Sequence, residues 1–192
     1  MPQHPVAGRQ RQPETGQVEV EWYAIVFEVI DMRSFSNLWF WIALAVLWST
    51  ASHWVLGVPY DLVLRARRRG GEAAEDVHLL IGVHTRRLLH VAEVSGIWLV
   101  AALCFALTML AMLGFWYRLE FAQALFCLAL PMALVGVLSL RAARRIAAGG
   151  LQGEGLYRAL ARHRLGVQAL GMLSIFVTAM WGMYQNLNLG AF

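Results

Sequence analysis

The sequence predicts an all-α membrane protein, built as a bundle of four transmembrane helices. Three observations predict this fold class. Hydrophobic residues make up 59% of the 192 residues and charged residues 15%, compared with about 45–50% and about 25% in soluble domains. Four apolar runs each have about the 20 residues needed to cross roughly 30 Å of hydrocarbon. Arginines are concentrated in two of the segments that separate these runs.

The N-terminal region precedes the apolar runs and has two parts. Residues 1–20 are rich in Pro and Gln, which predicts a disordered tail. An alternative is that translation starts downstream, at Val18 or Val20. Residues 21–36 are apolar, but Glu28, Asp31 and Arg33 interrupt them and prevent a span. Their aromatic residues predict an amphipathic helix that lies in the membrane interface.

The four apolar runs are predicted to be helical. Only helices and closed barrels satisfy backbone polar groups within lipid, and barrel strands alternate in polarity and are about half as long. The last three runs contain no charged residue, and the first contains one ionisable side chain, His53. A C-terminal tail follows at residues 188–192. The predicted spans are residues 38–58, 94–117, 121–140 and 165–184.

Arginine supplies all 16 basic residues, and 12 of them follow the first and third runs. The positive-inside rule therefore predicts a multi-pass protein of the bacterial inner membrane, with both arginine-rich loops in the cytoplasm and both termini in the periplasm. Guanidinium groups bind phosphate in a bidentate manner, so anionic lipids are expected partners and nucleic acid is not. The alternative is that these arginines only set the topology. The candidates for docking a partner or lipid are Arg65, Arg67, Arg68, Arg69, Arg141, Arg144 and Arg145.

Small and polar residues recur at helical spacing in the first and last runs. Residues four apart share one helix face, and small faces allow membrane helices to approach closely. His53 lies on such a face and is the intramembrane polar candidate, because ionisable groups within spans are usually functional. The alternative is a neutral His53 that hydrogen-bonds a neighbouring helix. The helix-packing candidates are Ala45, Ser49, Gly57, Gly171, Ser174, Thr178 and Gly182.

No pattern in the sequence points to catalysis. A Gly-rich phosphate loop, a nucleophile elbow and an HExxH motif are all absent. We therefore expect no enzymatic activity, no catalytic or metal-binding residues, no cofactor and no small-molecule substrate. Ligation of haem by two histidines needs a partner at the depth of His53, and the interiors of the other three spans contain no histidine.

Two stretches resemble a known family. They are FEVIDMRSFSNLWFWIALAVLWSTASHWVLGVPYDLVLRARR at 27–68 and SIFVTAMWGMYQNL at 174–187. They are similar to small alphaproteobacterial membrane proteins described as a component of the SufBCD complex, which assembles iron–sulfur clusters. The resemblance covers most of residues 21–187. It implies an accessory membrane partner of that machinery, and it brings no set of Cys ligands for a cluster.

These observations predict a non-catalytic accessory protein of the inner membrane. It would dock a cytoplasmic partner or a larger membrane complex, with a link to iron–sulfur cluster assembly implied by the resemblance. One alternative is a small transporter or channel subunit, which the absence of charged residues from the last three spans disfavours. A further alternative is a membrane protein that binds haem or quinone.

Overall fold

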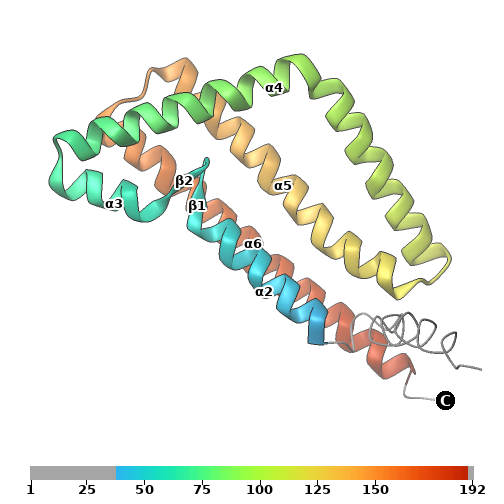
Figure 1. Cartoon of the computed structure of the whole chain (residues 1–192). Coiled ribbons are helices and arrows are strands. Elements are labelled where there is room, and N and C mark those ends of the chain that lie inside the picture. The colour runs from blue at the N-terminus through green and yellow to red at the C-terminus, as the bar shows by residue number, and fades with distance from the viewer. Residues whose placement is uncertain (1–37, 190–192) are drawn as a thin grey trace, which may run out of the picture. The chain divides into compact units, whose positions relative to one another are not determined.

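A computed structural model describes residues 38–189, all of which belong to one compact unit of the chain. The predicted disordered tail and interfacial helix, residues 1–20 and 21–36, lie outside the described residues, as do the last three residues of the chain. The described part is helical, apart from one short β-hairpin (Figure 1).

Three long helices confirm the prediction of a multi-pass membrane protein. They are α4 (Glu72–Ala111), α5 (Glu120–Gly149) and α6 (Gly153–Leu189). Each is long and apolar enough to cross a membrane. At about 1.5 Å per residue, each also exceeds the roughly 30 Å of hydrocarbon, so each helix extends beyond the lipid core.

The first apolar helix, α2 (Leu38–His53), is shorter than predicted. Its 16 residues correspond to about 24 Å, which is less than the thickness of the hydrocarbon. The prediction of one continuous helix over residues 38–58 is wrong at its C-terminal end. The described part of the chain therefore has three helices of spanning length and a shorter apolar helix, and a bundle of four spanning helices is not established by helix length.

A tight hairpin ends this first apolar run. The strands β1 (Trp54–Val55) and β2 (Val58–Pro59) pair in an antiparallel arrangement. Between them, Leu56 and Gly57 have φ values of 49° and 81°, as a two-residue turn with two positive φ angles requires. Glycine adopts this conformation at little steric cost, and Pro59 lacks the backbone N–H that a continuing helix would use.

Most of the predicted loop between the first two runs is helical. The helix α3 (Tyr60–Arg69) starts directly after the hairpin and ends at Gly70. Gly70 and Gly71 both have positive φ values, 63° and 56°, and turn the chain into α4. Figure 1 shows α3 beside the first half of α4, which then bends before its apolar second half.

The opposite end of α4 leads into α5 through a single π-helical turn, η2 (Met112–Trp116). Gly114 of this turn lies against α5, where an added Cβ would be 2.9 Å from the backbone nitrogen of Gln123. The buried Gln123 donates a 2.8 Å hydrogen bond to the carbonyl of Gly114 and accepts one of 3.0 Å from the indole of Trp181. It also accepts one from the amide of Gln185, so a single side chain joins η2, α5 and α6.

The largest hydrophobic cluster lies at the arginine-rich end and not among the apolar halves of the helices. The clusters in the apolar region are smaller: Phe40 packs with Ala124, and Leu44 and Trp48 pack with Val167. Lipid is as apolar as the side chains, so the hydrophobic effect drives packing only where water is present. The large cluster contains Val55, Leu56, Val58, Val63, Ala66, Val77, Ile81, Ile146, Leu156, Tyr157 and Leu160.

Candidate functional site at the arginine-rich end

The structure brings the two arginine-rich segments together into one unit, which we call the basic end. It comprises residues 54–87 and 141–164. The guanidinium of Arg67 on α3 donates two hydrogen bonds to the carboxylate of Glu154 on α6, at 3.0 and 3.3 Å. Arg158 lies 3.9 Å from the same carboxylate. The predicted docking residue Arg67 is therefore already engaged within the protein.

Two further contacts fasten α6 to the rest of the basic end. The guanidinium of Arg164 lies over the ring of Tyr60 at the start of α3, 4.1 Å from its centroid. The backbone N–H of Gly153 donates a 3.3 Å hydrogen bond to the ring of His78 on α4. Because these contacts join α3, α4 and α6 above a shared hydrophobic cluster, the basic end has a defined surface.

Most arginines on this surface are available to other molecules. They are exposed, and none forms an ion pair or a side-chain hydrogen bond within residues 38–189. Clustered charge of one sign attracts ligands of the opposite sign and raises their rate of encounter. The available arginines are Arg65, Arg68, Arg69, Arg86, Arg87, Arg141, Arg144, Arg145 and Arg162.

His53, the intramembrane polar candidate, lies at the C-terminal end of α2. It is the last residue of α2, its side chain is half exposed, and its Nε2 atom lies 4.0 Å from a carboxylate oxygen of Asp61. The helix ends there because the hairpin begins at Trp54. His53 therefore lies at the junction of α2 and the hairpin, at the edge of the basic end.

The packing face predicted for the first run is not the one that α2 uses. Ala45 and Ser49 are exposed, and Gly57 lies in the hairpin turn against the ring of His84. The buried face instead carries large residues, Phe40, Leu44 and Trp48. Large side chains fit on this face because α6 presents a small residue, Gly171, to the ring of Trp48.

The packing candidates predicted on the last run are small residues of α6. An added Cβ on Gly171 would lie 2.7 Å from the ring of Trp48, so only glycine allows this approach. Ser174, Thr178 and Gly182 continue the stripe and are also buried. The four small residues predicted on the last run thus lie together in the interior of the described part.

A partly buried polar pair, which was not predicted from the sequence, lies at the boundary between the basic end and the apolar region. The Nε2 atom of His163 lies 3.1 Å from the hydroxyl oxygen of Ser139, which donates its own proton to the carbonyl of Val135 at 2.9 Å. The direction of this hydrogen bond follows the tautomer of His163: a neutral ring protonated at Nε2 donates to Ser139 while the Ser139 hydroxyl donates to Val135. Burial lowers the pKa of His163, which favours this neutral form. The sequence contained one indication of this pair: Ser139 lies near the end of the run 121–140, and His163 lies just before the run 165–184.

A pocket of about 190 Å³ lies beside this pair, between α5 and α6. Arg141 and Arg145 of α5 and Arg162 of α6 line it, together with His163. Two of the predicted docking residues, Arg141 and Arg145, therefore line a concave part of the surface. Arg144 lies outside the pocket and is exposed.

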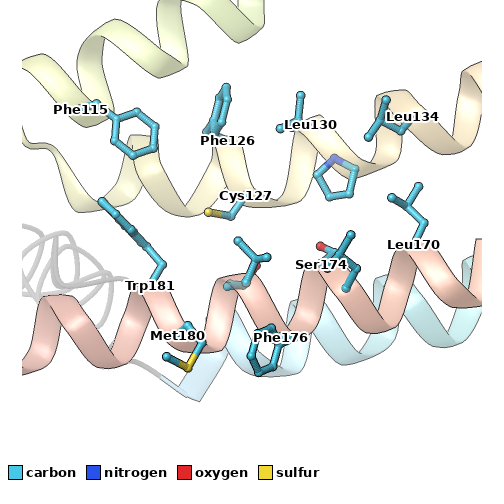
Figure 2. Close-up of a pocket in the computed structure, with 14 residues that line it drawn as sticks. Phe115, Phe126, Cys127, Leu130, Leu134, Leu170, Ser174, Phe176, Met180 and Trp181 are labelled. Atoms are coloured by element: carbon cyan, nitrogen blue, oxygen red, sulfur yellow. The ribbon is translucent and has the colours of Figure 1, made fainter.

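A second pocket, of about 490 Å³, lies in the apolar half of the molecule. Phe126, Cys127 and Leu130 of α5 line it together with Ser174 and Trp181 of α6 (Figure 2). Its lining is almost entirely apolar, and the buried hydroxyl of Ser174 has no hydrogen-bond partner.

Residues 38–189 contain several His, Cys, Asp and Glu side chains. Within them, no group of three or more His, Cys, Asp or Glu side chains is arranged to hold a metal ion, and Cys104 and Cys127 are both free thiols.

No protein-family model matches the chain, and no curated protein or solved structure matches it at a significant level.

Proposed function

We propose that this chain is a non-catalytic accessory protein of the bacterial inner membrane that docks a cytoplasmic partner on its basic end. The observation that carries the proposal is the combination of unpartnered surface arginines with the largest hydrophobic cluster of the described part. A surface held by a packed cluster pays less conformational entropy when a partner binds. An extended loop that served only as a topology signal would not need such a cluster.

The docking surface that we propose is the α3–α4 hairpin. Arg65, Arg68 and Arg69 are exposed at the end of α3, and the acidic first turn of α4, Glu72 and Glu75, lies directly after them. A surface with both signs of charge selects a partner of complementary pattern and suppresses incorrect ones. The resemblance to the family described as a component of the SufBCD complex favours a partner in iron–sulfur cluster assembly.

We also propose that α2 is a fourth membrane helix, with both termini in the periplasm. It packs along the membrane helices from Phe40, beside Ala124, to Trp48, beside Gly171. It therefore lies at the same depths as α5 and α6. Periplasmic reporters fused after Phe192 should be active, whereas cytoplasmic reporters should be active at Gly71 and Gly150. The reverse pattern at any of these sites would overturn the four-span arrangement.

Affinity purification in mild detergent, followed by mass spectrometry, tests the docking function. The variant Arg65→Gln/Arg68→Gln/Arg69→Gln should lose the partner that the wild type recovers, and the wild-type interaction should weaken at high salt. The matched control removes three arginines from the pocket between α5 and α6: Arg141→Gln/Arg145→Gln/Arg162→Gln. Both variants must first show wild-type orientation with the C-terminal reporter. Equal recovery by all three proteins at both salts would leave the α3 arginines as topology signals only.

The apolar pocket of Figure 2 favours one other candidate function, the binding of an apolar ligand of the size of a quinone ring. Its volume of about 490 Å³ lies within the usual range of roughly 300–1,000 Å³ for ligand pockets. Ser174 lines the pocket, and its buried hydroxyl has no hydrogen-bond partner among the described residues. Mass spectrometry of the organic extract of purified protein tests this candidate, and retention of bulk phospholipid alone would reject it.

A further inference from the structure

We propose that the pocket between α5 and α6 at the basic end binds the phosphate headgroup of one anionic phospholipid. Arg141 and Arg145 are four residues apart and therefore share one face of α5, and Arg162 lines the same pocket from α6. None of the three has an acidic partner within the described residues. Guanidinium groups match the geometry of phosphate oxygens and form strong charge-assisted hydrogen bonds with them.

Apolar as well as charged residues line the pocket, and Ala142, Leu151 and Ala159 lie among the arginines, outside the predicted spans. Leu138 and Gly166 also line the pocket, and they lie within the predicted spans 121–140 and 165–184. The arginines lie beyond the cytoplasmic ends of those spans or, for Arg162, before one begins. The pocket therefore crosses the boundary at which headgroups meet hydrocarbon, and acyl chains can continue beside Leu138.

The size and position of the pocket favour a lipid over a protein segment. Its volume of about 190 Å³ is that of roughly six waters at about 30 Å³ each, which suits a phosphodiester with its glycerol carbons. An acidic protein side chain would have to enter a recess between two membrane helices. The arginines of α3, in contrast, do not line this pocket and lie exposed on a helical hairpin. Basic pockets between membrane helices on the cytoplasmic side are known to suit anionic headgroups.

His163 forms the uncharged part of the wall. It is 9% exposed, and its Nε2 atom is used by Ser139. The charge that attracts the headgroup therefore comes from the three arginines. This assignment is independent of the docking function, which rests on α3.

Native mass spectrometry of the purified full-length protein tests the proposal. The protein is titrated with phosphatidylglycerol or with phosphatidylcholine that carries the same acyl chains. We expect one tightly retained phosphatidylglycerol. Arg141→Gln/Arg145→Gln/Arg162→Gln should weaken its retention by about 150-fold, which corresponds to three contributions of about 1 kcal/mol each. The matched variant Arg65→Gln/Arg68→Gln/Arg69→Gln removes the same charge from α3 and should change retention by less than about threefold.

Several results would overturn the proposal. Equal losses in the two triple variants would mean that the lipid responds only to the overall charge, and equal retention of phosphatidylcholine would mean that the headgroup is not recognised. Displacement of the lipid by millimolar inorganic phosphate would assign the pocket to the free anion, and displacement by a soluble acidic peptide would assign it to a protein. If the triple variant unfolds, the single variants Arg141→Gln, Arg145→Gln and Arg162→Gln replace it. Wild-type retention by all three would then reject the site.

Discussion

The two ends of α6 differ in what holds them to the rest of the protein. At the basic end, Leu156 and Leu160 are almost fully buried within a large hydrophobic cluster. In the apolar half, Leu173 and Phe176 of the same helix are exposed, although they are equally hydrophobic. The hydrophobic effect explains this difference. It drives the packing of apolar side chains in water at the basic end, and it is absent where lipid surrounds the helix. Close fit and hydrogen bonds must hold the apolar half.

The largest expected effect follows directly from that difference. Leu160→Ala removes a side chain with no exposed surface and should lower the free energy of unfolding by about 2–5 kcal/mol. Leu173→Ala makes the same change at a position that is 59% exposed on the same helix and should cost less than about 0.5 kcal/mol. Thermal unfolding of both variants in one detergent measures the contrast. Similar losses would show that the two halves of α6 are stabilised in the same way.

The next effect tests close fit in the apolar half. Gly171→Ala places a Cβ 2.7 Å from the ring of Trp48 and should cost about 1–3 kcal/mol, because a packed interior cannot make room without strain. Gly166→Ala is the matched control, since its Cβ would lie 3.9 Å from Leu138, an ordinary contact. Unfolding by heat in detergent should separate the two variants. A wild-type midpoint for Gly171→Ala would mean that α2 does not pack closely on α6.

The third prediction concerns the boundary between the two halves of α6, where His163 should make the free energy of unfolding depend on pH. Burial lowers the pKa of His163, so between the folded and unfolded values the unfolded chain holds a proton that the folded protein lacks. The stability from neutral His163 is complete above an unfolded pKa of about 6.5 and is lost as the pH falls below it, by at most about 1.4 kcal/mol per pH unit. His163→Gln should flatten this part of the curve of unfolding free energy against pH. A slope identical to that of the wild type would contradict the assignment.

The smallest effect concerns the exposed ion pair on the surface of the basic end. Arg67 and Glu154 are joined by two hydrogen bonds, but both side chains are about half exposed. Solvent screening therefore limits the pair to under about 1 kcal/mol. A double-mutant cycle with Arg67→Gln and Glu154→Gln measures this coupling. A coupling energy well above that limit would mean that the pair, and not the hydrophobic cluster, fastens α3 to α6.

The sequence predicted the apolar region well and the basic end poorly. The runs 121–140 and 165–184 lie within long helices, and the run 94–117 lies in α4 up to Ala111 and then in η2 up to Trp116. Uninterrupted apolar residues have few other structures available in lipid. The hairpin at residues 54–59 was not predicted, since Trp54, Val55 and Val58 continue the apolar run without a change of pattern. Its turn places Leu56 at a positive φ, which local preference disfavours and tertiary packing must enforce.

The candidate site was predicted in its residue types but not in its arrangement. The concentration of arginines identified both segments, whereas the pairing of Arg67 with Glu154 joins residues 87 positions apart. No periodicity within one segment can reveal such a contact. The packing face of α2 was assigned to small residues, but the small residues of the interface lie on α6, and Trp48 fills the space above Gly171. Complementarity of this kind depends on both helices together.

Site-specific photo-crosslinking in living cells tests the central claim, that the basic end docks a cytoplasmic partner, most directly. A photoreactive residue replaces Arg68 on α3 in one strain and Arg118, in the turn between η2 and α5, in another. Both positions are exposed arginines, at opposite ends of the predicted membrane helices. The account predicts a discrete adduct with a cytoplasmic protein from position 68 and none from position 118. Adducts from position 118 alone, or only lipid adducts from position 68, would contradict it.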